Sequence, residues 1–296
     1  MTSINVNEKD SLKTLQAAFD SGVNFFDTAY GYGANGESEC MIAQALGKHR
    51  HEIVIATKCG MHWDEIPQRK FDARPERIKR ECEESLRRLK TDHVELLYLH
   101  APDPHVPVVE SARALKELMD AGKARSIGVS NFTVEQLESF YAVCPISAFQ
   151  PAYNMLQRQI EQDTLPWCRE HKVSVMVYWP LMKGLLAGHL PRDHVFESKD
   201  GRAKYPMFHG DEWQKNQDFL DRLREVAKDA NRTVSQVVIN WTVHQPGVTV
   251  ALCGAKRAYQ IEETAGAMGW KLSPEQFEAI DQALKDRGQP VVGSAV

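Results

Sequence analysis

The sequence predicts an α/β fold in which parallel strands alternate with helices and surround a common core. Two observations lead to this expectation. Seven short apolar segments alternate with helical segments along the 296 residues, and near-continuous apolar strands are typical of a parallel sheet covered on both faces. In addition, reactive side chains stand at the C-terminal ends of the early strands, which is the edge where α/β barrels carry their active sites.

The first half of the chain consists of regular strand and helix units. Apolar segments such as VELLYL at 94–99 predict buried strands, and the intervening segments have helical character. The Ser130-Asn131 pair is expected to begin the helix that follows it. In order, we predict helix 11–21, strand 23–27, helix 37–47, strand 53–58, helix 75–89, strand 94–100, helix 108–121, strand 124–129, helix 134–142 and strand 146–150.

The second half keeps the alternation but contains an irregular polar stretch at about 187–212. Thr233 with Gln236, and Ser273 with Gln276, have the spacing of capping boxes and mark two helix starts. We predict helix 160–172, strand 173–178, helices 214–230 and 234–244, strand 248–253, and helices 259–268 and 274–285. No linker rich in Pro, Gly or Ser interrupts the chain, so we expect a single domain over residues 1–296.

Composition excludes several classes of function. The net charge is −4 with scattered Lys and Arg, so no basic face for nucleic acid or an anionic membrane is expected. The polar start and the lack of a long apolar run predict a cytoplasmic protein without a membrane span. The six cysteines show no C-x-x-C pair, so reduced thiols are expected, with Cys59 and Cys253 beside expected site positions.

One glycine pattern invites a misleading interpretation. Gly31, Gly33 and Gly36 match G-x-G-x-x-G between a strand and a helix, which is the dinucleotide fingerprint. That fingerprint needs an acidic residue at the end of the next strand to hold the ribose, and this strand ends in Lys58. A flexible loop that exposes Tyr32 is the better interpretation.

Four side chains at strand ends form the candidate catalytic set, namely Asp27, Tyr32, Lys58 and His100. A carboxylate at the end of a buried strand needs a partner, and Lys58 on the next strand can supply it. An ammonium close to the Tyr32 hydroxyl favours the phenolate, so that Tyr32 can donate a proton, while His100 binds a substrate oxygen. Taken singly, the alternatives are a structural ion pair, a loop aromatic and a core histidine.

At this point the chain resembles the aldo-keto reductases from about residue 11 to residue 268. The resemblance implies a (β/α)8 TIM barrel that reduces aldehydes and ketones with NADPH, with Asp27, Tyr32, Lys58 and His100 as its tetrad. The matching segments are Asp27-Thr28-Ala29, Tyr32-Gly33, Ser38-Glu39, Thr57-Lys58, Leu99 to Asp103, Gly128 to Phe132, Gln150-Pro151, Tyr153-Asn154, Tyr178 with Pro180-Leu181, Gly184 to Leu186 and Gly254 to Arg257.

The resemblance also implies the cofactor contacts. Ser130, Asn131 and Gln150 would bind the nicotinamide carboxamide, and Tyr178 would stack on its ring. Lys256 and Arg257 would take the adenosine 2′-phosphate; independently, the segment from Gly254 follows the last strand and opens a helix, where backbone amides and cations suit a phosphate. The remaining cofactor residues implied are Pro180, Leu181, Gln260 and Glu263.

Departures from the family pattern and the start of the chain limit the expectation. Trp179 replaces a commonly small polar residue, and Thr264 stands where Asn is common. Residues 1–10 cannot hold the capping hairpin and first strand that family members place before the first helix, so we expect an N-terminally truncated barrel of about seven strands. Three explanations are consistent with this expectation: the native chain starts upstream, residues 2–6 form a stunted first strand, or the barrel closes poorly. We favour the first.

The expected reaction is hydride transfer to a carbonyl carbon, with Tyr32 as general acid. Two alternatives stay open: an NADPH-binding regulatory module of the same fold, and a metal-dependent hydrolase using His100 and His105. We expect no bound metal and a small carbonyl substrate with an apolar or aromatic body. The candidate lining residues are Tyr30, His62, Trp63, Trp179, Tyr205, Phe208 and Trp213.

Overall fold

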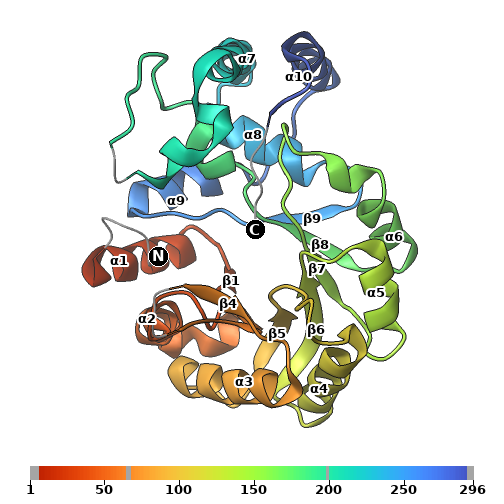
Figure 1. Cartoon of the computed structure of the whole chain (residues 1–296). Coiled ribbons are helices and arrows are strands. Elements are labelled where there is room, and N and C mark those ends of the chain that lie inside the picture. The colour runs from red at the N-terminus through yellow and green to blue at the C-terminus, as the bar shows by residue number, and fades with distance from the viewer. Residues whose placement is uncertain (1–6, 65–67, 198–199, 292–296) are drawn as a thin grey trace. The chain divides into compact units, whose positions relative to one another are not determined.

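The fold is built on a parallel sheet, as the alternation of the sequence predicts (Figure 1). A computed structural model describes residues 7–64, 68–197 and 200–291, so the proposed strand at 2–6 lies outside the described residues. Within them, seven strands form one sheet in the order β1-β2-β5-β6-β7-β8-β9. These strands are β1 (Phe25–Asp27), β2 (Val54–Cys59), β5 (Val94–Leu99), β6 (Ala124–Ser130), β7 (Ala148–Gln150), β8 (Ser174–Val177) and β9 (Val248–Ala251).

The register of the strands determines which residues lie beside Lys58. Lys58 of β2 pairs with Tyr98 of β5, Tyr98 pairs with Gly128 of β6, and all of these pairings are parallel. Tyr98 is fully buried, and a Cβ atom on Gly128 would lie 2.4 Å from Cε1 of Tyr98. Glycine at position 128 therefore makes the room that the Tyr98 ring occupies beside Lys58.

Helices cover the outer face of the early strands, with α2 to α5 following β1 to β6 around the sheet (Figure 1). Thr133 and Gln136 form a full capping box at the start of α5. The two predicted capping boxes, Thr233 with Gln236 and Ser273 with Gln276, are also formed. The helices are α1 (Glu8–Asp20), α2 (Glu37–Leu46), α3 (Pro75–Leu89), α4 (Val108–Asp120), α5 (Val134–Tyr141), α6 (Thr164–Glu170), α7 (Gly210–Asp229), α8 (Val234–Val243), α9 (Ala258–Ala265) and α10 (Pro274–Arg287).

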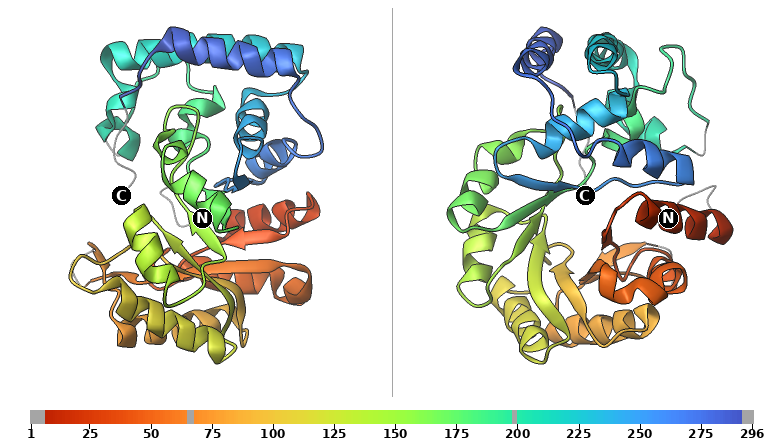
Figure 2. Two further views of the ribbon diagram at one scale, coloured as in Figure 1. Left: turned by 90° about the vertical axis from the view of Figure 1, so that its right-hand side faces the viewer. Right: turned by 180° about the vertical axis from the view of Figure 1, so that it is seen from behind.

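The chain divides into two compact units. The first comprises residues 1–151, 163–175 and 254–262, and the second comprises residues 152–162, 176–253 and 263–296. In the second unit α7 and α10 lie side by side (Figure 2), and buried Arg287 of α10 donates from Nε to Oδ1 of Asn216 at 3.1 Å. The single domain over residues 1–296 stays a prediction.

Several local expectations are wrong, each for an identifiable reason. Thr133, not Ser130-Asn131, caps the helix α5, because Ser130 still belongs to β6. The helix expected from residue 160 begins at Thr164, because the side chain of Asp163 caps it there. The polar stretch 187–212 contains short 3-10 helices, η4 (Gly201–Lys204) and η5 (Pro206–Phe208), and the start of α7.

The sequence interpretation missed one element that borders the site. Strands β3 (Met61–Trp63) and β4 (Arg69–Phe71) form an antiparallel hairpin directly after β2. Its strands have three residues each, which is too short for an alternating pattern to stand out in the sequence. None of the helices in the described part of the chain is both long enough and apolar enough to span a membrane.

Candidate active site

A buried ion pair forms the centre of the site. Nζ of Lys58 donates to Oδ1 of Asp27 at 2.5 Å and to the carbonyl of Thr28 at 2.8 Å, and the Lys58 side chain is only 1% exposed. Burial lowers the pKa of Lys58, but the negative charge of Asp27, with a further contribution from Tyr32, outweighs burial and raises this pKa above its ordinary value. Lys58 is therefore a permanent cation at this position.

Tyr32 and His100 lie next to this cation. Nζ of Lys58 is 5.1 Å from the ring centre of Tyr32, and the rings of Tyr32 and His100 meet edge to face with centres 5.7 Å apart. Burial, followed by the positive charges of Lys58 and Arg69, holds the pKa of His100 well below its ordinary value. His100 is thus a neutral imidazole at neutral pH.

The residues expected at the nicotinamide end lie in the same unit, and two of them, Asn131 and Gln150, contact the candidate catalytic residues. Nε2 of Gln150 donates to Oδ2 of Asp27 at 2.8 Å. The hydroxyl of Ser130 donates to the carbonyl of Gln150 at 2.6 Å, and Nδ2 of Asn131 donates to the carbonyl of His100 at 3.1 Å. Asp27 is thus fixed by two donors, one on each carboxylate oxygen.

A second network, formed by Thr57, Glu39 and Arg88, supports the end of β2. The hydroxyl of Thr57 donates to Oε1 of Glu39 at 2.6 Å, and Nη1 of Arg88 lies 3.3 Å from Oε2 of this carboxylate. Burial raises the pKa of the Glu39 carboxyl, although hydrogen bonds from Thr57 and Ser85 oppose it. These residues hold the position of β2, and no sequence pattern marks Arg88 as functional.

Two cations of the expected phosphate site stand at the start of α9. The backbone amides of Lys256 and Arg257 donate to Oε1 of Gln260 at 2.8 and 3.1 Å. Lys256 is exposed, and Nη1 of Arg257 lies 3.6 Å from Oδ2 of Asp10. The preceding Gly254 is exposed, and a Cβ atom there would meet nothing within 4 Å. The first unit therefore places two cations at one helix start, where the side chain of Gln260 accepts from both backbone amides.

The remaining expected cofactor residues lie in the second unit. The backbone amide of Tyr153 donates to the carbonyl of Tyr178 at 3.1 Å, and Pro180 is buried while Leu181 is partly exposed. Oε2 of Glu263 lies 3.4 Å from Nε2 of His189, and its Oε1 is buried without a partner among the described residues.

Trp179, which departs from the family pattern, also lies in the second unit. It has a left-handed backbone with φ of 62°, and Nζ of Lys183 lies 3.9 Å from the centre of its ring. Phe208 and Trp213 pack against each other with ring centres 6.1 Å apart and are 3% and 5% exposed. This burial favours core packing over a role in lining the site for Phe208 and Trp213.

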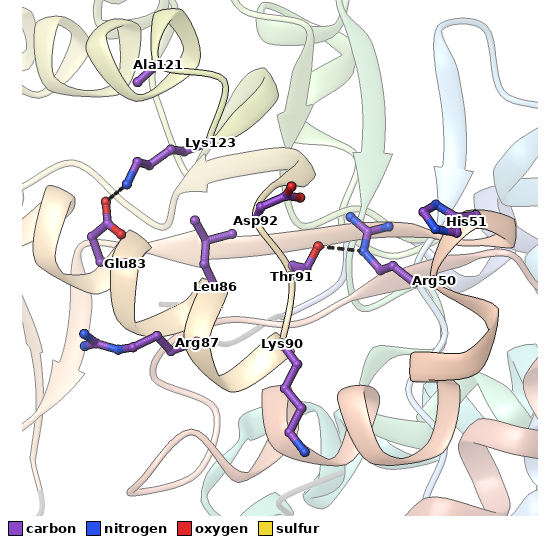
Figure 3. A pocket seen from close by; sticks show the side chains of 10 residues that line it. All are labelled: Arg50, His51, Glu83, Leu86, Arg87, Lys90, Thr91, Asp92, Ala121 and Lys123. Atoms are coloured by element: carbon purple, nitrogen blue, oxygen red, sulfur yellow. Dashed lines mark hydrogen bonds and ion pairs between the residues drawn. The ribbon is translucent and has the colours of Figure 1, made fainter.

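A basic hollow of about 940 Å³ lies away from these residues (Figure 3). Most of its residues precede the strands β2, β5 and β6, so it lies at the N-terminal ends of the strands, opposite the catalytic candidates. Lys123 forms an ion pair with Glu83 there, and Nε of Arg50 donates to the hydroxyl of Thr91 at 3.1 Å. Within the described residues, no group of three or more His, Cys, Asp or Glu side chains is arranged to hold a metal ion.

Comparison with known proteins identifies the class. The profile of the aldo/keto reductase family matches residues 2–285, and the chain belongs to this family. The predicted family, its α/β barrel class and its oxidoreductase chemistry are thereby confirmed. The assignment of individual residues to the catalytic tetrad and to cofactor binding stays a prediction.

Individual relatives agree with the family assignment. Aldo-keto reductase YhdN of Bacillus subtilis is 37% identical over 290 residues, which cover 97% of this chain and 87% of the relative. The NADH-specific methylglyoxal reductase of Escherichia coli is 30% identical over 275 residues, with coverage of 88% and 83%.

Solved structures agree on the fold. The glycerol dehydrogenase AKR11B4 of Gluconobacter oxydans superposes with a TM-score of 0.91 at 35% identity, covering 97% of this chain and 89% of that one. An aldo/keto reductase of Klebsiella pneumoniae, solved in complex with NADP and acetate, gives a TM-score of 0.72 at 28% identity, with coverage of 93% and 85%.

Proposed function

We propose that the protein reduces the carbonyl group of an aldehyde or ketone to an alcohol, with NADPH as cofactor and Tyr32 as the proton donor. The observation that carries the proposal is the position of a permanent buried cation, Lys58, 5.1 Å from the Tyr32 ring and fixed by Asp27. A cation beside a phenol stabilises the phenolate that remains when the proton leaves. Such an arrangement favours proton donation by Tyr32.

His100 has a different role in this proposal. Its pKa lies well below the ordinary value, so at neutral pH the ring carries no surplus proton to give. Its Nδ1 is buried without a partner among the described residues. The neutral ring beside Tyr32 orients the carbonyl oxygen by hydrogen bonding, and the proton comes from the phenol.

The residues present fit a dinucleotide. When bound, NADPH supplies the hydride. Asn131, Ser130 and Gln150 present amide and hydroxyl groups beside the tetrad, which is the chemistry that a carboxamide needs. Lys256 and Arg257 present two cations at a helix start, which is the chemistry that a phosphate needs. Tyr178, Pro180, Leu181, Gln260 and Glu263 complete the proposed set.

The substrate is proposed to be a small carbonyl compound with an apolar or aromatic body. Trp63 supports this, because its indole lies on the hairpin beside the Tyr32 loop, where Nε1 donates to the carbonyl of Gly31 at 2.9 Å. Tyr30, by contrast, donates its hydroxyl to Glu84 of α3 at 2.6 Å and so is directed away from Tyr32. A cytoplasmic location remains part of the proposal.

The decisive experiment compares two tyrosine variants. Oxidation of NADPH is followed by its absorbance with a panel of aldehydes and ketones. We expect Tyr32→Phe to lower kcat by about a hundredfold or more while NADPH binding, measured by fluorescence, persists. Tyr30→Phe, two residues away, should retain turnover, because its hydroxyl contacts α3.

Two results would contradict the proposal. Near-normal turnover in Tyr32→Phe would show that Tyr32 is not the proton donor. Tight NADPH binding by the unaltered protein without turnover of any carbonyl compound would favour a regulatory module of the same fold.

A further inference from the structure

The hairpin β3-β4 presents two faces of different character. Side chains alternate along each strand, and the register pairs Met61 with Phe71, His62 with Lys70 and Trp63 with Arg69. Trp63 and Arg69 therefore share one face with Met61. His62 and Lys70 share the other face, where Nδ1 of His62 lies 3.7 Å from Oε1 of Glu81 on α3.

The face that carries Trp63 is directed toward the tyrosine loop. Nε1 of Trp63 donates to the carbonyl of Gly31 at 2.9 Å, one residue before Tyr32. A Cβ atom on Gly31 would lie 2.7 Å from the carbonyl oxygen of Met61, so the loop and the hairpin are in close contact there. The hairpin is thus held against the segment that bears the proposed proton donor.

Arg69 places a positive charge on this face. Its guanidinium carbon lies 5.4 Å from the centre of the Trp63 ring, a cation-π arrangement that holds the side chain over the indole. Arg69 is exposed and forms no ion pair within the described part of the chain. Its charge nevertheless acts on His100, whose pKa it lowers together with burial and Lys58.

We propose that Arg69 selects carbonyl substrates that carry a carboxylate group. Arg69, Trp63, Gly31 and Tyr32 form a continuous series of contacts or neighbours, which leads to the proton donor from a guanidinium that has no ion-pair partner among the described residues. A guanidinium binds a carboxylate through two parallel hydrogen bonds. The inference rests on the proposed function and adds the substrate class: an aromatic or apolar body with the carbonyl at one end and a carboxylate at the other.

Lys70, the neighbouring cation on the hairpin, is ion-paired and provides a matched control. Nζ of Lys70 lies 3.0 Å from Oδ2 of Asp64, so its charge is compensated on the opposite face of the hairpin. Replacing Lys70 by Met removes one positive charge from the hairpin, as does replacing Arg69 by Met. The Lys70 replacement leaves the face that contacts Gly31 unaltered.

The experiment compares two substrates of similar shape, 4-carboxybenzaldehyde and its neutral methyl ester, methyl 4-formylbenzoate. For the unaltered protein we expect kcat/KM to be higher for the carboxylate. In Arg69→Met the ratio of kcat/KM between carboxylate and ester should fall about tenfold, mainly through KM, and in Lys70→Met the ratio should be unchanged. Because Arg69 is exposed, added salt should reduce the ratio of the unaltered protein toward that of Arg69→Met.

The outcomes separate this inference from the proposed function. If the unaltered protein reduces both compounds and Arg69→Met leaves their ratio unchanged, selection by Arg69 is overturned while carbonyl reduction stands. An equal loss for both compounds in Arg69→Met would mean that Arg69 supports the hairpin without reading charge, which also overturns the inference. If neither compound nor any other carbonyl compound is reduced, the proposed function fails and the inference fails with it.

Discussion

Lys58 and Asp27 form an ion pair of 2.5 Å between Nζ and Oδ1 at the junction of β1 and β2, where Lys58 is almost completely buried. The two strands pair in parallel with Asp27 opposite Ala56, which brings the side chain of Lys58 beside the carboxylate. Gln150 from β7 binds the other carboxylate oxygen at 2.8 Å. Three strands thus fix one cation in place next to Tyr32.

Replacing Asp27 by Asn should damage both stability and turnover. The substitution leaves the buried ammonium of Lys58 without its counter-charge, and breaking a buried pair typically costs about 3–5 kcal/mol. Urea unfolding should show a loss of roughly 3 kcal/mol, and kcat should fall at least tenfold. The double variant Asp27→Asn with Lys58→Met removes the stranded charge and should regain most of the stability but none of the turnover. Recovery of turnover in the double variant would show that the pair has only a structural role.

Gly128→Ala should destabilise the protein by overpacking. The added Cβ would lie 2.4 Å from Cε1 of Tyr98 and 2.8 Å from the backbone carbonyl of Ala148. Insertions of this kind cost about 1–3 kcal/mol in a packed core. Gly47→Ala, where a Cβ meets nothing within 4 Å, is the control and should change the free energy of unfolding by less than about 1 kcal/mol. Equal effects of the two substitutions, measured by urea unfolding, would contradict the close contact between Tyr98 and β6.

The buried carboxyl of Glu81 should make stability depend on pH. Oε2 of Glu81 accepts from the amide of Gly60 at 2.6 Å and Oε1 accepts from Arg77 at 2.6 Å, yet burial raises the pKa of Glu81 to about 6 from an ordinary 4.5. A raised pKa means that the folded state binds a proton more tightly than the unfolded state. Its contribution is therefore present below pH 4.5 and is lost as the pH rises through about 6.

This prediction is measured as a difference between two proteins. The free energy of unfolding of the unaltered protein, minus that of Glu81→Gln, should fall by roughly 2 kcal/mol between about pH 3.5 and about pH 7, since each pKa unit corresponds to about 1.4 kcal/mol. Buried acids that form no ion pair or hydrogen bond with Glu81, such as Glu39, titrate in both proteins and cancel in the difference. A difference that stays flat or rises over this range would refute the raised pKa of Glu81.

Cofactor preference is predicted to depend on Lys256, which is exposed, and on Arg257, which is partly exposed. If Lys256 and Arg257 bind the 2′-phosphate, the double substitution to Met should raise the KM for NADPH at least tenfold and leave the KM for NADH nearly unchanged. Lys215→Met with Arg222→Met removes the same charge from exposed positions on α7 and should change neither. A relative of this chain is named as an NADH-specific reductase, so equal KM values for the two cofactors in the unaltered protein are a real alternative and would remove the phosphate site.

The sequence predicted the regular parts of the fold well because each strand and helix has a strong local signal. VELLYL is buried at five of six positions in β5, and Thr233 with Gln236 forms the capping box that its spacing indicated. The site residues were predictable for a related reason: Asp27 and Lys58 end or nearly end neighbouring strands, and parallel strands bring such ends to one edge. The hairpin β3-β4 was not predictable, because its strands are too short for alternation to stand out.

The sequence alone therefore determined the order of elements, the edge of the sheet that carries reactive side chains and the identity of the four candidate catalytic residues. Only the tertiary structure decided how these side chains are charged and what stands beside them. Burial and the charges of Lys58 and Arg69 make His100 neutral, and Asp27 keeps Lys58 charged in spite of burial. The physical reason is that ionisation depends on desolvation and on charges distant in the sequence. The position of Arg69 also depends on the tertiary structure, because a register of three residue pairs puts it on the same face of the hairpin as Trp63, whose indole contacts the carbonyl of Gly31.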